Sequence, residues 1–189
     1  MKNLLKSCKI AVVCLVSMTI VLASCKKDDD PEKSNELNYK GNKYNLDAAE
    51  LKLIGQVSST SYYYILNFTS EGADLNTTLT DTIINLTFEG EGNILIFPIF
   101  SDSPNRLTEG TYNFDPYFSA LPFTFIPPDF IYSIFLDFNF YTATGIQSYL
   151  NSGNIIVNRT ESEYEIEING KDPSGNDVIG YYKGPISME

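Results

Sequence analysis

Histidine and tryptophan are missing from this 189-residue chain, and its three cysteines all fall within the first 25 residues. Without histidine, serine and cysteine catalytic groups that depend on an imidazole base are excluded, as are histidine-ligated metal sites. Beyond Cys25 the chain carries no thiol, so the rest of the chain must be stabilised by packing rather than by disulfides. We therefore expect a non-catalytic protein with no cofactor and no metal.

Basic residues are also few, with 13 Lys and Arg against 24 Asp and Glu and a net charge of −11. An acidic surface repels the phosphate backbone of nucleic acids and the head groups of anionic lipids. Nucleic acid is therefore not an expected partner, and direct electrostatic docking on a membrane is not expected either.

The one long apolar run is too short to span a membrane as a helix. Three lysines precede a mostly apolar segment at residues 10–23, about 14 residues where a transmembrane helix needs about 20. A basic start followed by such a segment is typical of a secretory signal peptide.

The residues that end this segment, Leu22-Ala23-Ser24-Cys25, resemble the lipobox of bacterial lipoproteins. The resemblance implies cleavage before Cys25, which would carry a diacylglycerol and a further acyl chain on its amine. Two or three acyl chains make membrane attachment effectively stable. The alternative is an ordinary signal peptide followed by an unrelated cysteine. Without residues 1–24 the chain has 10 basic and 24 acidic residues, a net charge of −14.

The charges after Cys25 bear on location. Residues 26–30, Lys-Lys-Asp-Asp-Asp, resemble the export signal of surface lipoproteins in Bacteroidetes-type bacteria, which implies an outer-membrane protein facing the cell exterior. A solvated tether would explain the same charges. Residues 25–36 contain almost nothing to bury and are expected to form a flexible acidic tether ahead of one domain at 37–189.

Apolar and polar residues alternate through most of that domain, which indicates half-buried strands. At 163–169 acids alternate with Tyr164, Ile166 and Ile168, and at 94–100 both faces are apolar. Pro98 within that second run points to an edge strand or a bulge. The other predicted strands are 49–56, 62–69, 82–89, 110–114, 130–141, 154–159 and 177–183.

About nine or ten short strands separated by turn-rich pieces predict an all-β fold. We expect an antiparallel meander closing into a lipocalin-like barrel, with a two-sheet β-sandwich as the alternative. A short helical turn is possible at 143–150. The C-terminal third, from Gly153 to Gly184, resembles the closing strands of uncharacterised Bacteroidetes-type lipoproteins with small β domains. That resemblance implies a fold and no activity.

Aromatic residues concentrate between Tyr112 and Tyr141, which hold 12 of the chain's 25 Phe and Tyr. Those outside the predicted strands lie in a proline-rich loop and form the candidate ligand-binding set: Tyr117, Phe118, Phe123 and Phe125. Such a loop suits a platform for sugar rings or a lid over an apolar pocket. Alternatively, it folds down and covers an open barrel end.

Three further patterns are weaker. Asp172, Ser174 and Asn176 alternate like the start of a calcium loop, but a glycine and a closing acid are missing, so we assign a hairpin turn and no metal. Thr82 sits in an Asp-Thr-Ile triplet that resembles an O-glycosylation acceptor of the same bacteria. A carboxylate pair for glycoside hydrolysis would have to come from Glu109, Asp115, Asp129 and Asp137.

The leading hypothesis is a lipid-anchored, non-catalytic surface protein that binds a glycan or a small apolar ligand. The alternative is a structural or adhesive surface protein that contacts another protein. A hydrolase is the third and weakest reading.

Overall fold

Strands account for all the regular secondary structure in the computed structural model, which describes residues 33–80, 83–126, 133–160 and 162–188. The predictions for Cys25, the lipobox and Thr82 lie outside the described residues. Residues from Ser34 onward form one unit, which begins slightly ahead of the predicted boundary. The strands are β1 Glu36–Tyr39, β2 Asn42–Asn45, β3 Ala48–Ser58, β4 Ser61–Thr69, β5 Ala73–Thr80, β6 Ile83–Ser101, β7 Gly110–Phe114, β8 Thr124–Phe125, β9 Ile134–Asn139, β10 Thr144–Ser148, β11 Ser152–Arg159, β12 Tyr164–Lys171, β13 Asp177–Gly184 and β14 Ser187–Met188.

The all-β, barrel-like fold is confirmed. The main path of the sheet runs β14-β3-β4-β6-β8-β7-β11-β12-β13-β1-β2, and β9 and β5 pair with other parts of β6. The pairs β14–β3 and β7–β8 are parallel and the rest antiparallel. The strand order does not follow the chain order throughout. Strand β4 pairs with β6 rather than with β5, which comes next in the sequence, and the β1–β2 hairpin pairs with β13.

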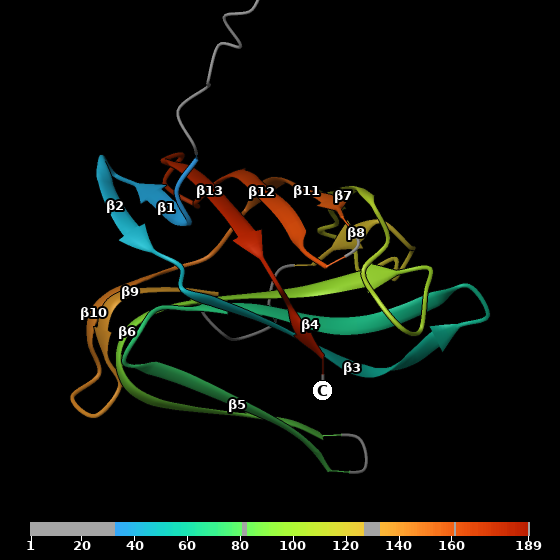
Figure 1. Cartoon of the computed structure of the whole chain (residues 1–189), viewed down its shortest axis with the longest axis horizontal. Coiled ribbons are helices and arrows are strands. Elements are labelled where there is room, and N and C mark those ends of the chain that lie inside the picture. The colour runs from blue at the N-terminus through green and yellow to red at the C-terminus, as the bar shows by residue number, and fades with distance from the viewer. Residues whose placement is uncertain (1–32, 81–82, 127–132, 161, 189) are drawn as a thin grey trace, which may run out of the picture. The chain divides into compact units, whose positions relative to one another are not determined.

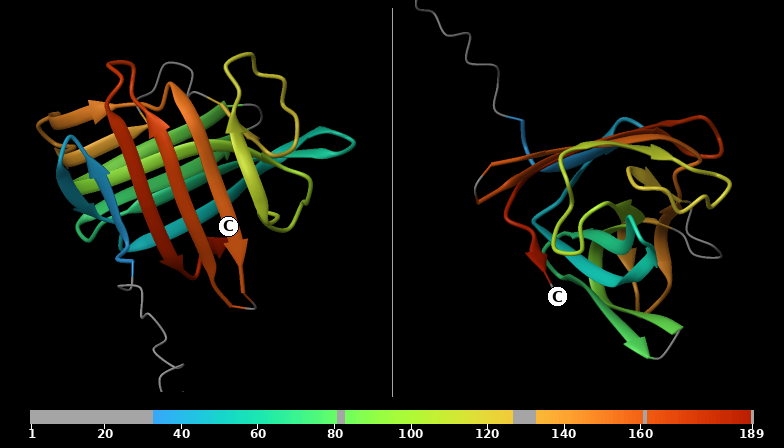
Figure 2. Two further views of the ribbon diagram at one scale, coloured as in Figure 1. Left: turned by 90° about the horizontal axis from the view of Figure 1, so that it is seen from above. Right: turned by 90° about the vertical axis from the view of Figure 1, so that its right-hand side faces the viewer.

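The sheet curls strongly into a half-barrel, so its two ends face each other across a common core. Strands β11, β12 and β13 cross over β3, β4 and β6, as Figure 2 shows in its left panel. One apolar cluster joins both sides, with Leu66 and Phe97 from one and Ile155 and Ile168 from the other. The interior of the half-barrel is therefore filled by side chains.

A second, smaller apolar cluster lies on the outer face of β4 and β6. The hairpin of β5 and the first half of β6 folds back beneath these strands (Figure 1) and covers Ile65, Ile94 and Ile96 with Leu75 and Phe88. This arrangement explains why residues 94–100 are apolar on both faces: odd positions face the main core and even positions face the hairpin.

Pro98 lies in a strand paired on both sides, not in an edge strand as expected. It stands opposite Ile65 of β4, and its carbonyl accepts the N–H of Ile126 at 3.0 Å on the side of β8. Since the N and C=O of a strand residue point the same way, its missing N–H falls on that side, between the segments that pair with β8 and β9. Pro98 thus interrupts the ladder where the partner strand changes.

Two other expectations were wrong. The helical turn at 143–150 is the strand β10, which pairs with β9 through a bulge. The predicted strands at 82–89 and 94–100 are one 19-residue strand, β6, and Gly90 and Gly92 allow it to bend without ending. Both glycines have positive φ, 85° and 153°, and a Cβ on Gly90 would lie 1.9 Å from the carbonyl oxygen of Gly72.

The start of the domain is fastened by Asn35. Its side chain receives the N–H of Lys183 at 2.7 Å and donates to the carbonyl of the same residue at 3.1 Å. Its own carbonyl accepts the N–H of Leu46 at 3.0 Å. The first residues of the domain are thereby joined to β13 and to the end of β2.

Candidate functional site

The four aromatic residues of the candidate ligand-binding set do not share one surface. Phe125 lies in β8, is 1% exposed, and packs edge-on against Phe97 and Phe114 with centroid distances of 6.2 and 5.5 Å. It belongs to the main core and is withdrawn from the candidate set. The short strand β8 pairs with both β6 and β7, which turns this side chain inward.

Phe123 is also directed toward the core. It is half-buried, and its ring centroid lies 5.3 Å from that of Tyr112, a fully buried residue of β7. A Cβ on Gly110 would approach the Phe123 ring to 2.9 Å, so this glycine makes room for it. Phe123 therefore packs between the loop and the core and does not belong to the exposed face of the loop.

Tyr117 and Phe118 do face solvent. Their side chains are 88% and 42% exposed, and Leu121 beside them is 59% exposed. We call residues 115–123 the aromatic loop and these three side chains its outer face. The outer face is smaller than the four-residue platform expected from the sequence, because only two of its four members point outward.

The Asp115 carboxylate holds the backbone of the first half of the aromatic loop. Its two oxygens accept the N–H of Tyr117 at 2.9 Å and the N–H and hydroxyl of Ser119, both at 2.6 Å. Burial alone would raise the pKa of Asp115, but these hydrogen bonds outweigh it and hold the pKa below its ordinary value. Asp115 was a candidate catalytic acid, and its oxygens are instead engaged by the loop.

Backbone strain concentrates in the same loop. Phe118, Ala120 and Phe123 all have positive φ, at 54°, 54° and 62°. Non-glycine residues in this region are unfavourable and persist only where surrounding contacts impose them, often near functional sites. Here the Asp115 carboxylate bonds Tyr117 and Ser119, which flank Phe118, and Phe123 forms backbone hydrogen bonds with Phe100 and Asn113.

Two of the candidate carboxylates, Glu109 and Asp115, are too far apart to form a glycosidase pair. Glu109 and Asp115 flank the two ends of β7, so at about 3.3 Å per residue their Cα atoms lie roughly 20 Å apart. Glycosidase carboxyl groups lie about 5–10 Å apart. Asp137 is exposed at the β9 bulge, where its N–H donates to the Asn93 side chain at 2.9 Å. Asp129 lies outside the described residues.

The calcium-like pattern at Asp172 is a closed turn. The Asp172 carboxylate accepts hydrogen bonds from the N–H groups of Ser174 and Asn176, from the Asn176 side-chain amide and from the Tyr39 hydroxyl, at 2.7–2.9 Å. Burial opposes its charge, but these donors lower the pKa of Asp172 to about 2. Within the described residues, no group of three or more His, Cys, Asp or Glu side chains is placed to hold a metal ion.

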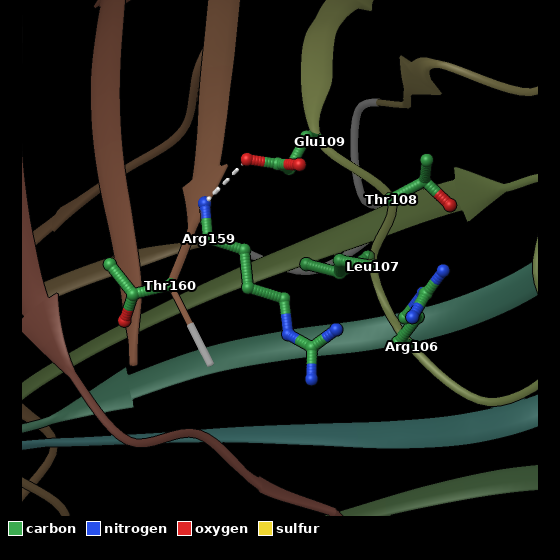
Figure 3. A pocket seen from close by; sticks show the side chains of 6 residues that line it. All are labelled: Arg106, Leu107, Thr108, Glu109, Arg159 and Thr160. Carbon is green, nitrogen blue, oxygen red and sulfur yellow. Dashed lines mark hydrogen bonds between the residues drawn. The ribbon is translucent and has the colours of Figure 1, made fainter. Parts of the chain in front are cut away.

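A cavity of about 450 Å³ at one end of β7 and β11 was not foreseen from the sequence. Its lining residues are Arg106, Leu107, Thr108, Glu109, Arg159 and Thr160. Figure 3 shows the two arginine side chains with Leu107 between them in this view. The Oε1 of Glu109 accepts the backbone N–H of Arg159 at 3.0 Å, which joins the loop before β7 to the end of β11. The sequence held one hint of this cavity: Arg106 and Arg159 are the only two arginines in the chain.

A second hollow, of about 420 Å³, is lined mainly by polar residues around Asn93. Asn93 is buried, and its side-chain amide donates to the carbonyl of Asn45 at 3.2 Å. Its backbone N–H donates to the Ser70 hydroxyl at 2.8 Å, and its carbonyl accepts the N–H of Ser70 at 2.9 Å. Together with the bond from the Asp137 N–H, these contacts join β2, β6, β9 and the turn after β4, so the polar groups of Asn93 are used in holding the fold. A third hollow, of about 410 Å³, lies beside Lys40 and Gly175.

No protein-family model, no curated protein and no solved structure matches this chain. The described residues contain no helix that is long and apolar enough to cross a membrane.

Proposed function

We propose that this protein is a non-catalytic binding protein, held at the outer-membrane surface by acyl chains on Cys25, and that the outer face of the aromatic loop contacts a glycan. The observation that carries the proposal is the exposure of Tyr117 on a loop whose backbone Asp115 fixes. A tyrosine kept in solvent on an ordered backbone loses little conformational entropy when a ligand stacks on it.

A glycan suits this surface better than a small apolar ligand does. An apolar ligand needs a concave site that removes most of its surface from water. The half-barrel interior is filled by the main core, and none of the three cavities described above is lined by residues of the aromatic loop. Sugar rings can instead stack on an exposed aromatic side chain without a deep pocket.

The surface location rests on the resemblance of residues 22–25 to a lipobox and of residues 26–30 to an export signal. Metabolic labelling with a clickable fatty acid tests the first part, because label should enter the protein and be lost in Cys25→Ala. Protease treatment of intact cells tests the second, because a protein facing outward is degraded while periplasmic controls survive.

A glycan array with the full chain in detergent tests the binding role. Tyr117→Ala should lower affinity for any glycan bound at least tenfold, since truncating an aromatic hot spot costs about 2 kcal/mol or more. Tyr141→Ala is the matched control, because Tyr141 is 78% exposed but lies outside the aromatic loop. An empty array, or equal effects of the two substitutions, would refute the aromatic loop as the glycan site.

The alternative, an adhesive or assembling surface protein, draws support from strand β5. In the described part of the chain, β5 pairs with β6 and no other strand, and Leu79 on it is 42% exposed. An unpaired strand edge is a template for pairing with a second chain. Sedimentation of the full chain at rising concentration distinguishes the two, because assembly through the free edge of β5 predicts oligomers that Leu79→Pro abolishes.

A further inference from the structure

We propose that Arg106 and Arg159 form a binding site for the carboxylate of a sugar acid, in the cavity at the end of β7 and β11. The site is separate from the outer face of the aromatic loop, because Tyr117 follows one end of β7 and the cavity lies at the other end. The inference therefore stands or falls independently of the glycan contact proposed for Tyr117.

The distribution of charge is the first argument. The chain carries a net charge of −11 and has only two arginines, which come from positions 53 residues apart and line one cavity. Two guanidinium groups that share a cavity repel each other unless an anion joins them. Among the described residues, neither guanidinium has a carboxylate within ion-pair distance. Arginine is well suited to binding a carboxylate, because the planar guanidinium group donates two parallel hydrogen bonds to the two carboxylate oxygens.

The segment that carries Arg106 is ordered before any ligand arrives. Leu107 is fully buried and joins the main core, and two fully buried tyrosines hold the backbone on either side of it. The Tyr64 hydroxyl donates to the carbonyl of Ser103 at 2.8 Å, and that of Tyr112 donates to the carbonyl of Thr108 at 2.9 Å. Binding through Arg106 therefore costs little ordering of the loop.

Arg159 is also positioned by its neighbours. It is the last residue of β11, and its N–H is fixed by Glu109. Its guanidinium carbon lies 5.6 Å from the centroid of the Tyr164 ring, within range of a cation–π contact. Arg106 thus enters the cavity from a loop held by hydrogen bonds, and Arg159 enters it from the end of β11.

The remaining lining residues favour a sugar acid over a bare phosphate or sulfate. The Glu109 carboxylate repels a dianion at the rim but accepts hydrogen bonds from sugar hydroxyls, and the hydroxyls of Thr108 and Thr160 add further donors and acceptors. A volume of about 450 Å³ exceeds what a single inorganic ion fills and lies in the range of small-molecule sites.

Isothermal titration of the full chain in detergent tests the proposal, with glucuronate as the probe and with glucose and inorganic phosphate as comparison ligands. We expect glucuronate to bind and the other two to bind at least tenfold more weakly. Arg106→Gln and Arg159→Gln should each weaken glucuronate binding at least tenfold. Lys40→Gln is the matched control, because Lys40 is an exposed cation beside a hollow of similar size and should leave binding unchanged.

Three outcomes would overturn the proposal: no binding of glucuronate at millimolar concentration, equal binding of glucuronate in both arginine variants, or phosphate binding as tightly as glucuronate. Both arginines are exposed, so the variants should keep the wild-type melting temperature and far-ultraviolet spectrum. Arg159→Lys provides a second variant if Arg159→Gln does not fold, and it should also weaken binding because an ammonium lacks the planar fork.

Discussion

Replacing Asp172 by Asn would remove the charge at the centre of the turn between β12 and β13. The carboxylate accepts four hydrogen bonds and is 3% exposed. In Asp172→Asn the amide nitrogen would take the place of one oxygen. If it replaces Oδ2, a donor would face two other donors, the Asn176 amide at 2.7 Å and the Tyr39 hydroxyl at 2.8 Å.

The magnitude follows from those two contacts. A hydrogen bond to a charged group contributes about 1.5–3 kcal/mol, and buried donors left without an acceptor add a penalty. With partial relaxation of the turn we expect a loss of about 2–4 kcal/mol in the free energy of unfolding at pH 7. For a domain of this size that corresponds to a melting temperature lower by about 5–15 °C.

The effect should depend on pH in a definite direction. The pKa of Asp172 is about 2 in the folded protein, below its ordinary value of 3.8. A lowered pKa stabilises the fold fully above the ordinary value, and the contribution is lost as the pH falls toward the folded value. The difference in unfolding free energy between wild type and Asp172→Asn should therefore shrink as the pH is lowered from about 4 toward 2.

Urea denaturation at pH 7, 4, 3 and 2.5 measures this difference. The control is Asp177→Asn, which removes an acid close by in the sequence that is exposed and bonded to Lys171 at the surface. Exposed ion pairs contribute about 0–1 kcal/mol, so this variant should unfold nearly like the wild type. Equal losses for the two variants, or a difference that stays constant down to pH 2.5, would refute the role assigned to the Asp172 carboxylate.

Two further predictions concern packing and buried polar groups. Gly90→Ala should cost more than about 3 kcal/mol, because the residue has positive φ and its Cβ would meet the Gly72 carbonyl, whereas Gly55→Ala, with nothing within 4 Å, should change the unfolding midpoint little. A Gly90→Ala protein as stable as the Gly55→Ala control would contradict the bend in β6. Tyr112→Phe should cost about 1–3 kcal/mol in thermal or urea unfolding, because the Thr108 N–H and carbonyl lose a buried partner; wild-type stability would show that the hydroxyl does not hold the loop.

The fold was predictable from sequence where bulky and polar residues alternate cleanly. Residues 164–171 form a strand with Tyr164, Ile166 and Ile168 in the core, as expected. Strand β5 was missed, because Leu75 is its only bulky buried residue: Thr77 is its other buried position, Leu79 is exposed, and the remaining residues are small or polar. Alternation in the sequence reveals a strand only if one face of that strand is distinctly apolar.

The candidate site was harder to predict, because it depends on long-range pairing. Which way Phe125 points is set by the pairing of β8 with both β6 and β7, and a two-residue strand carries no periodicity of its own. The meeting of Arg106 with Arg159 likewise follows from the pairing of β7 with β11, and no local pattern indicates it. Short windows of sequence do not predict which side chains the pairing of distant strands brings together.

If the protein is anchored through Cys25 as proposed, the hydrogen bonds of Asn35 have a mechanical consequence. Tension on the proposed anchor would act on Asn35, whose side chain bonds both backbone groups of Lys183. The next residues form β1, which lies between β13 and β2 and is bonded to both. Tension would therefore be shared among two ladders and one side-chain clamp before it reached β7, the strand whose two ends carry the two proposed binding sites.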